Sequence, residues 1–304
     1  MSRRAVTVRV PGKVNLQLSV GGARDDGYHD VVSVFQAVSL FDDVAATQAP
    51  PGAGISVAVS GQQRGVPTDH TNLAARAAQL LADHAGVEPD VHLRVDKMIP
   101  VSGGMAGGSA DAAGALLACD ALWDTRYGRD QLLALASRLG ADVPFSLVGG
   151  TAVGVDRGDR LTPALVRSRF HWVFALADEA MSTPAVYREL DRLRDGERVR
   201  KPTVSDSLMH ALGTGDAAAL GLALRNDLEP AAISLLPSLA RTLDVGYEYG
   251  ALGSVVSGSG PTCAFLVQDA DDALDLAVAL SAAGVCRTVK RAHGPVPGAR
   301  LVDH

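Results

Sequence analysis

The sequence predicts an α+β protein of two domains, and three observations lead to this prediction. The chain has 304 residues, which exceeds the usual size of a single domain. Segments with the alternating pattern of β-strands are mixed, in irregular order, with alanine- and leucine-rich segments of helical spacing. A polar, proline-containing segment, residues 156–169, lies near the middle of the chain. We therefore expect one domain at residues 1–158 and a second at residues 159–304.

Several segments of the first half predict strands. Val6–Val10 alternates apolar and polar residues, and Val14–Val20 continues the alternation after a break at Pro11 and Gly12. Other segments are β-branched or alternating, and a glycine-rich stretch predicts a turn followed by a pair of strands. These segments are Val31–Leu40, Ile55–Gly61, Val91–Ile99 and residues 143–155.

Helices are expected in both halves. In the first half they cover Thr71–His84, about Gly108–Trp123 and Asp130–Leu139, the last ending at a glycine. The second half opens with a strand at residues 171–177 and contains a strand-loop-strand unit at Ser254–Val267. Its charged segment, Leu190–Pro202, is interpreted as solvated surface. Its expected helices are Ser205–Leu212, Ala217–Leu224, Ala231–Leu243 and Ala270–Ala283.

Composition excludes several classes of protein. The chain is 47% hydrophobic and carries a net charge of −6, which favours a full core and disfavours a nucleic-acid binder. Three separated cysteines without a CxxC pattern, Cys119, Cys263 and Cys286, indicate neither a zinc site nor a disulfide framework. The amino-terminal residues lack the apolar core of a signal peptide, and no apolar run is long enough to span a membrane. We expect a cytoplasmic protein.

The stretch PVSGGMAGGSADAAGAL, residues 100–116, places four glycines before an expected helix. Glycines allow a close approach of backbone N–H groups, and the start of a helix adds unpaired N–H groups and a positive dipole end. Together these features predict a phosphate site, in which Ser109 caps the helix or reaches a phosphate or its metal ion. The Walker pattern and GxGxxG are both absent. A plain tight turn is the alternative interpretation.

Four other features are weak when taken singly. Lys13 could be an ordinary exposed lysine, and Asp142 could merely cap a turn. Tyr28 and His29 could be ordinary loop residues, and SGSGPT at 257–262 could be a hairpin turn. Their occurrence together with a phosphate loop favours a nucleotide-dependent site.

These motifs, in this order, resemble the GHMP small-molecule kinases over nearly the whole chain. The segments that carry the resemblance are PGKVNLQLSV, DDGYHDVVSVFQAVSLFDDV, IPVSGGMAGGSADAAGAL, LGADVPFSLVGGTAVGVDRGD, STPAVY, RNDLE and SGSGPTCAFL. The resemblance implies an amino-terminal mixed α/β domain, a carboxy-terminal ferredoxin-like α+β domain, and an active site in the cleft between them. The DGYH element is similar to that of the subfamily whose alcohol substrate carries a cytidine diphosphate group.

The resemblance implies an ATP-dependent kinase that uses Mg²⁺. The product would be phosphorylated at the tertiary hydroxyl of a methylerythritol unit, in the non-mevalonate route to isoprenoids. Asp142 would be the base that accepts the proton of the acceptor hydroxyl, and Lys13 its cationic partner. No metal ligand follows from the sequence beyond Ser109, and the oligomeric state does not follow from it.

The resemblance also assigns binding residues. Asn72 and Lys97 would contact the adenosine end of ATP, and the backbone of the glycine-rich stretch would hold its phosphates. The residues of that stretch are Pro100, Gly103, Gly104, Met105, Ala106, Gly107, Gly108 and Ser109. The substrate residues would be Asn15, Tyr28, His29, Thr183 and Tyr187, with His29 hydrogen-bonded to cytosine and the two tyrosines on either side of the ring.

The sequence departs from the family pattern within the glycine-rich stretch. Met105 and Ala106 stand where leucine and glycine are commoner, and Ala110 replaces a second serine. Two alternatives stay open: another kinase of the family, acting on homoserine, mevalonate or a sugar, and a noncatalytic nucleotide-binding module. A serine hydrolase is disfavoured because neither Ser109 nor Ser259 lies in GxSxG.

Overall fold

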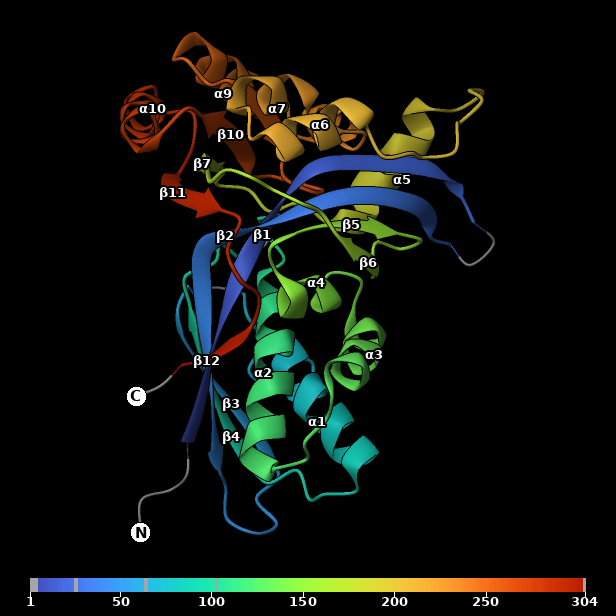
Figure 1. Cartoon of the computed structure of the whole chain (residues 1–304), viewed down its shortest axis with the longest axis vertical. Coiled ribbons are helices and arrows are strands. Elements are labelled where there is room, and N and C mark those ends of the chain that lie inside the picture. The colour runs from blue at the N-terminus through green and yellow to red at the C-terminus, as the bar shows by residue number, and fades with distance from the viewer. Residues whose placement is uncertain (1–4, 25–26, 63–64, 102, 303–304) are drawn as a thin grey trace.

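Two β-sheets with helices packed on them make up the molecule (Figure 1). The computed structural model describes residues 5–24, 27–62, 65–101 and 103–302. The larger sheet has eight strands, and its main path runs in the order β12-β1-β2-β4-β3. The smaller sheet has four strands in the order β11-β7-β10-β9. This mixture of sheets and helices confirms the predicted α+β class.

Two long antiparallel strands form the spine of the larger sheet. Strand β1 (Ala5–Ala23) pairs with β2 (His29–Gln48), and the pair runs from the lower end of Figure 1 to the upper right. The register shifts at three places, the first between Pro11 and Gly12. Such irregularities bend and twist a strand without ending it. The expected break at Pro11 is therefore a bend inside one continuous strand, and the next residues of β1 are those that enter the site.

The other strands of the larger sheet come from distant parts of the chain. Strand β3 (Ile55–Gly61) lies parallel to β4 (Val91–Lys97), with helix α1 (Leu73–Ala85) as the crossover between them. Strand β5 pairs with β2, and β6 with β5, whereas β8 and β12 pair with β1. Their bounds are Thr151–Val155 for β5, Arg160–Pro163 for β6, Arg225–Asn226 for β8 and Arg300–Val302 for β12. A domain boundary after residue 158 stays a prediction, since three of these strands follow it.

Helix α2 (Gly107–Trp123) lies inside the larger hydrophobic core and packs beside the lower half of the spine in Figure 1. Eleven of its 17 residues are buried, and they lie on every side of the helix. A helix that is apolar all round belongs inside a protein. It packs on β1, β2 and α1, together with α3 (Arg129–Leu139) and α4 (Val143–Val148). This packing fixes where the amino-terminal end of α2 points.

The smaller sheet is fully antiparallel and lies above the spine in Figure 1. Its strands are β7 (Phe170–Leu176), β9 (Gly253–Val256), β10 (Cys263–Val267) and β11 (Thr288–Gly294). Six helices accompany it: α5 (Thr183–Leu193), α6 (Asp206–Thr214), α7 (Ala217–Ala223), α8 (Glu229–Leu235), α9 (Ser238–Glu248) and α10 (Ala270–Ala282).

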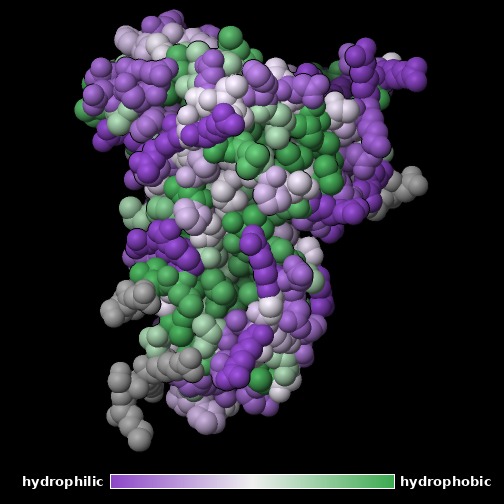
Figure 2. Space-filling model, in the orientation of Figure 1, coloured by the Kyte–Doolittle hydropathy of each residue, from purple (hydrophilic) through white to green (hydrophobic). Residues whose placement is uncertain are grey.

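One hydrophobic core continues from the larger sheet into the smaller one. Trp172 and Phe174 of β7 pack in the same cluster as the apolar residues of β1 and α2. The indole N–H of Trp172 donates to the side-chain oxygen of Gln36 on β2, at 3.0 Å. On the face shown in Figure 2, hydrophobic residues gather over the middle of the molecule, and hydrophilic ones cover its outer ends. The shared core and the Trp172–Gln36 hydrogen bond therefore hold the two sheets together.

Two expectations of secondary structure are wrong. The stretch expected as a turn and two strands begins with helix α4, which Pro144 favours in its first turn, and only β5 follows. The single helix expected at Ala231–Leu243 is two helices, α8 and α9. Pro237 has no N–H and disfavours the helical conformation of the preceding residue, Leu236, which adopts φ −137° and ψ 83°.

The three cysteines are free thiols in the described residues. Cys119 and Cys263 are buried free thiols, and burial raises the pKa of each well above its ordinary value. Cys286 is half-buried and also free. Among the described residues, no helix has the length and apolar character needed to cross a membrane.

The contact of Gly114 with the spine predicts an unusual effect of alanine. A Cβ at this position in α2 would lie 2.7 Å from Val44 and 2.9 Å from Val10, inside their van der Waals radii. We expect Gly114→Ala to lower the free energy of unfolding by about 1–3 kcal/mol, as overpacking does. The measurement is urea unfolding.

Gly213→Ala is the matched control, because this glycine of α6 has open space around its Cβ direction. There the same substitution should stabilise the protein by up to about 1 kcal/mol through helix propensity. Equal effects of both substitutions would contradict the packing argument.

Candidate active site

A large cleft of about 1330 Å³ contains most residues that the sequence singled out. Its walls come from β1, the residue pair Tyr28 and His29, the starts of α1 and α2, the α3–α4 link, α5, and the loop at 258–260. Fourteen of the fifteen residues expected to bind substrate or cofactor line it, together with Lys13 and Asp142. The exception is Met105, which is buried behind the wall.

Two glycine-rich loops meet at the floor of this cleft. Gly104 adopts φ +68°, and a Cβ there would overlap the carbonyl oxygen of Ser257. A Cβ on Gly103 would lie 2.8 Å from the hydroxyl oxygen of Thr262. The Ser257 hydroxyl donates to the carbonyl oxygen of Gly104 at 3.2 Å. These glycines are thus required by the contact between the loops, in addition to any approach of a ligand.

Helix α2 begins directly after this contact. Ala106, its N-cap residue, has φ +58° and provides no side-chain cap. Gly107 is the first helical residue, so Ser109 is the third helical residue and the expectation that its hydroxyl caps the helix is wrong. The first N–H groups of α2 consequently have no side-chain cap and remain available to an anion. The departure from glycine at Ala106 places a Cβ in the left-handed region, where glycine is favoured.

Lys13 lies beside the junction of the two loops. Its backbone N–H donates to the carbonyl oxygen of Met105 at 3.2 Å, which ties β1 to the first loop. Its ammonium group donates to the side-chain oxygen of Asn15 at 2.5 Å and lies 3.9 Å from a carboxylate oxygen of Asp142. Burial lowers the pKa of Lys13, and the charge of Asp142 acts in the opposite direction. Asn15 in turn donates to Ser33 at 2.7 Å.

Asp142 is placed to act on a ligand. It is the N-cap residue of α4, yet its carboxylate accepts no capping hydrogen bond, which argues against a purely structural role. Its side chain is 34% exposed, in contrast to the 6% of Lys13. Burial raises the pKa of Tyr187 to about 12, and the charge of Asp142 contributes. Asp142 is therefore near both Lys13 and Tyr187.

Lys97 is held in a buried network at the back of the cleft. Its ammonium lies 2.7 Å from Asp42 and 2.6 Å from Asp111. Burial acts to lower the pKa of Lys97, but the two carboxylates outweigh it and the pKa is raised. Burial raises the pKa of Asp111 to about 7. Asp42 also accepts hydrogen bonds from the backbone N–H groups of Met98 and Ile99. The network therefore fixes the end of β4 against the start of α2.

The remaining residues assigned to ATP also lie at this end of the cleft. Asn72 is the N-cap of α1 and accepts from the N–H of Ala74 at 2.8 Å, while its amide donates to Pro67. Pro100 and Gly108 lie on the cleft wall. Contact of Asn72 or Lys97 with a nucleotide stays a prediction, because both side chains already have protein partners.

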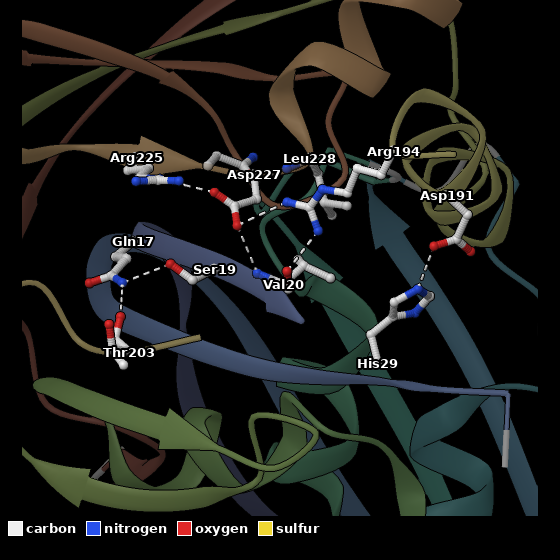
Figure 3. Close-up of polar contacts among 11 residues, drawn as sticks. Gln17, Ser19, Val20, His29, Asp191, Arg194, Thr203, Arg225, Asp227 and Leu228 are labelled. Atoms are coloured by element: carbon white, nitrogen blue, oxygen red, sulfur yellow. Dashed lines mark hydrogen bonds and ion pairs between the residues drawn. The ribbon is translucent and has the colours of Figure 1, made fainter. Parts of the chain in front are cut away.

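Three of the residues expected to bind the substrate, Tyr28, His29 and Tyr187, form an aromatic wall of the cleft. The rings of His29 and Tyr187 lie 5.0 Å apart with an interplanar angle of 35°. The Nε2 atom of His29 lies 2.8 Å from a carboxylate oxygen of Asp191, and the two side chains point toward one another in Figure 3. Tyr28 is 57% exposed and lies under the guanidinium of Arg157, at 5.8 Å. A base held between Tyr28 and Tyr187 stays a prediction.

Contacts between β1 and the second half of the chain hold this wall in place. Arg194, just after α5, donates to the carbonyl oxygen of Val20 at 2.7 Å and to Asp227 at 3.2 Å (Figure 3). Asp227 also accepts the N–H of Val20. Thr183, at the start of α5, lies 2.8 Å from the hydroxyl of Ser259 in the second glycine-rich loop. The aromatic wall and the junction of the two glycine-rich loops are therefore linked through the second loop.

Two parts of the chain match known family models. Residues 72–150 match the GHMP kinases N terminal domain, and residues 208–286 match the GHMP kinases C terminal domain. A protein of Streptomyces avermitilis is 58% identical over 299 residues, covering 98% of this chain and all of that protein.

The chain belongs to the GHMP kinases. The Streptomyces avermitilis protein is named 4-diphosphocytidyl-2-C-methyl-D-erythritol kinase. A protein of Streptomyces coelicolor with the same name is 57% identical, again with 98% of this chain and the whole of that protein covered. The family resemblance inferred from the motifs is thereby confirmed.

Solved structures agree with this membership. A crystal structure of 4-(cytidine 5'-diphospho)-2C-methyl-D-erythritol kinase superposes with a TM-score of 0.77 at 31% identity, covering 98% of this chain and all of that one. Homoserine kinase from Cytophaga hutchinsonii gives 0.76 at 18% identity, covering 99% and 98% of the two chains. The second likeness shows the shared two-domain GHMP kinase fold alone, and this fold confirms the predicted architecture.

Several residues of the site escaped the sequence reasoning. Asp42 and Asp111 were not singled out. Asp111 lies within the apolar run ADAAGALLACDAL, and a carboxylate in such a run is a signal of a buried charge that needs a partner. Asp191 and Arg188 lie in or beside the charged segment interpreted as solvated surface. Asp191 lies four residues after Tyr187, and Arg188 lies four residues after Pro184, and this helical spacing would have placed them on one helix face.

Lys97→Met tests the buried network. Without the ammonium group, Asp42 and Asp111 are left buried without a cation, and we expect the free energy of unfolding to fall by about 3–5 kcal/mol. Loss of the ammonium group should also raise the pKa of Asp111 further in the folded state. The folded protein then binds a proton that the unfolded protein does not, which favours folding at low pH, and this contribution is lost as the pH rises. The deficit should therefore be larger at pH 8 than at pH 5, measured by denaturant unfolding.

Arg241→Met is the control, because it removes an exposed ion pair with Glu248. This change should alter stability by less than about 1 kcal/mol, as is usual for surface pairs. A Lys97→Met deficit no larger than that of the control would contradict the account.

Proposed function

We propose that the protein transfers the γ-phosphoryl group of ATP to the tertiary hydroxyl of 4-diphosphocytidyl-2-C-methyl-D-erythritol, in the cytoplasm. One observation carries the proposal: a single cleft joins an uncapped helix start, the Lys13–Asp142 pair and the His29–Tyr187 wall. A phosphate donor, a reacting hydroxyl and a flat base each have a suitable surface there. The names of the relatives at 57–58% identity support the choice of acceptor.

In this proposal, the glycine-rich stretch from Gly103 to Ser109 and the start of α2 hold the phosphates of ATP. Unpaired N–H groups at the start of a 17-residue helix provide donors and a positive dipole end. Phosphoryl transfer depends mainly on positioning and on neutralising charge, which these fixed groups can supply. The adenosine end would lie near Asn72 and Lys97.

Asp142 would accept the proton of the acceptor hydroxyl as the new O–P bond forms at the γ-phosphorus. The bond from that phosphorus to the β–γ bridging oxygen breaks, and ADP leaves. The ammonium of Lys13 would favour the ionised form of Asp142 and the developing alkoxide. Asn15 and Ser33 hold this ammonium in place through their hydrogen bonds.

Mg²⁺ would accompany ATP. Asp111 has one buried carboxylate oxygen, Oδ1, without a hydrogen-bond partner in the described part of the chain, and it lies on the cleft wall two residues after Ser109. Hard oxygen atoms of this kind suit Mg²⁺, which takes most of its other ligands from phosphates and water. No group of three or more His, Cys, Asp or Glu residues suited to a metal occurs among the described residues, in keeping with an ion carried by the nucleotide. The ion would offset phosphate charge.

His29 and Tyr187 would bind the cytosine ring. Asp191 can accept the Nε2 proton of His29, which leaves Nδ1 as an acceptor for an exocyclic amino group. Aromatic stacking on Tyr187 suits a flat base. Asn15 and Thr183 would border the methylerythritol part, and Tyr28 would cover the base from the exposed side.

An acceptor panel tests the function. The purified protein receives ATP, Mg²⁺ and one acceptor at a time, and ADP release is measured together with the ³¹P spectrum of the product. The acceptors are 4-diphosphocytidyl-2-C-methyl-D-erythritol, methylerythritol phosphate, mevalonate, homoserine and galactose. We expect turnover only with the first, with a new phosphate monoester signal and an unchanged diphosphate.

Turnover with another acceptor would contradict the substrate proposal and favour a different kinase of the family. ATP binding without turnover on any acceptor would instead favour a noncatalytic nucleotide-binding module.

A further inference from the structure

The charge of the cleft is opposite to that of the whole protein. The chain carries a net charge of −6. Three aspartates line the cleft, namely Asp111, Asp142 and Asp191. Six lysines and arginines line it as well, namely Lys13, Arg76, Lys97, Arg138, Arg157 and Arg188. A cleft with this excess of positive groups suits polyanionic ligands.

These cations are not equally available to a ligand. Lys97 is held by two carboxylates, and Lys13 lies beside Asp142. Arg157 pairs with Asp159 at 3.0 Å. Arg188, by contrast, is exposed and makes no ion pair or hydrogen bond with any residue in the described ranges. On the aromatic side of the cleft, it is the guanidinium that a bound anion could take without breaking an existing contact.

Helix geometry directs Arg188 into the cleft. The residues of α5 that line the cleft are Thr183, Pro184, Tyr187, Arg188 and Asp191, whose spacing of one, three, one and three defines one helix face. Val186 and Leu190, on another face, are buried in the core of the smaller sheet. Arg188 therefore shares its face with Tyr187, which contacts His29.

Arg157 lies at the same wall but comes from another part of the chain. It lies in the turn between β5 and β6, and its guanidinium is 5.8 Å from the centroid of the Tyr28 ring. Two arginines near the aromatic group formed by Tyr28, His29 and Tyr187 thus line the cleft. In a nucleoside diphosphate, the phosphates follow the base at the distance of one ribose. Guanidinium groups bind phosphate oxygens in paired, charge-assisted hydrogen bonds.

We propose that Arg188, assisted by Arg157, binds the diphosphate group of the acceptor and so distinguishes a nucleoside diphosphate from a nucleoside. This inference rests on the proposed function, because it assumes that the aromatic wall holds the base of the acceptor. It adds a specificity-determining residue: the base selects cytidine, and Arg188 selects the diphosphate. ATP would bind at the other end of the cleft and would not depend on Arg188.

The test compares two small ligands that differ only in the diphosphate. Cytidine and cytidine 5'-diphosphate are titrated by calorimetry into the wild-type protein, Arg188→Gln and Arg192→Gln. Arg192 is the matched control, because it lies on the same helix with its side chain 65% exposed, pairs with Glu189 and does not line the cleft. Unfolding curves of all three proteins check that they are folded.

We expect Arg188→Gln to weaken cytidine 5'-diphosphate by about 10- to 100-fold, the range of charge-assisted hydrogen bonds, and to leave cytidine unchanged. Arg192→Gln should leave both ligands unchanged. In steady-state assays, Arg188→Gln should raise KM for the full acceptor, with KM for ATP and kcat unaffected. Arg188→Lys should give an intermediate KM, since it keeps the charge but loses the planar fork.

Three outcomes would overturn the proposal. Arg188→Gln could weaken both ligands equally, weaken neither, or raise KM for ATP instead of the acceptor. Each of these would leave the cytidine site itself in place. Failure of the wild-type protein to bind either ligand would instead contradict the proposed function, so the two failures can be told apart.

Discussion

The site depends on the contact between two glycine-rich loops that are far apart in the chain. The hydrogen bond from Ser257 to Gly104 joins residues 153 positions apart, and at Gly104 no side chain larger than hydrogen fits. The same first loop accepts the backbone N–H of Lys13 through Met105. The second loop reaches α5 through Ser259 and Thr183. One backbone junction thus connects the start of α2, the Lys13–Asp142 pair and the aromatic wall.

The buried helix α2 and the Lys97 network set the position of that junction. Because α2 is buried on all sides, its start cannot shift without disturbing the core. Asp42 of β2 binds Lys97 at the end of β4 and the N–H of Met98 that follows it, and Lys97 also pairs with Asp111 in the second turn of α2. A buried ion network is costly unless every group is paired, so its arrangement is strongly specified. The uncapped N–H groups of α2 are therefore preorganised for a ligand.

Much of this arrangement follows from the sequence. The glycine-rich stretch predicted an anion site because of the chemistry of glycine and of helix starts, and it lies on the cleft as expected. The motif order gave the family. Pairings between distant strands, such as β8 and β12 with β1, were beyond reach because two or three residues carry no periodicity. The split at Pro237 was predictable in principle, since a proline inside a helical pattern breaks it.

Charges posed a different difficulty. Lys97 was assigned to the nucleotide, and only the fold reveals its two carboxylate partners, which lie 55 and 14 residues away in the chain. Asp191 was interpreted as surface because its segment, Leu190–Pro202, is rich in charge, and Arg188, just before that segment, was not singled out. They face the cleft because α5 starts before that segment and turns one face inward. Partners distant in sequence and helix phase both require the three-dimensional structure.

Turnover by Asp142→Asn, measured beside ATP binding, tests the central claim most directly. The account predicts that kcat falls by about 10²- to 10⁴-fold, the usual contribution of a general base, while the Kd for ATP stays unchanged. Asp130→Asn, an exposed aspartate at the start of α3, should leave both quantities unchanged. Near-normal turnover by Asp142→Asn would contradict the claim that the Lys13–Asp142 pair at the loop junction performs the proton transfer.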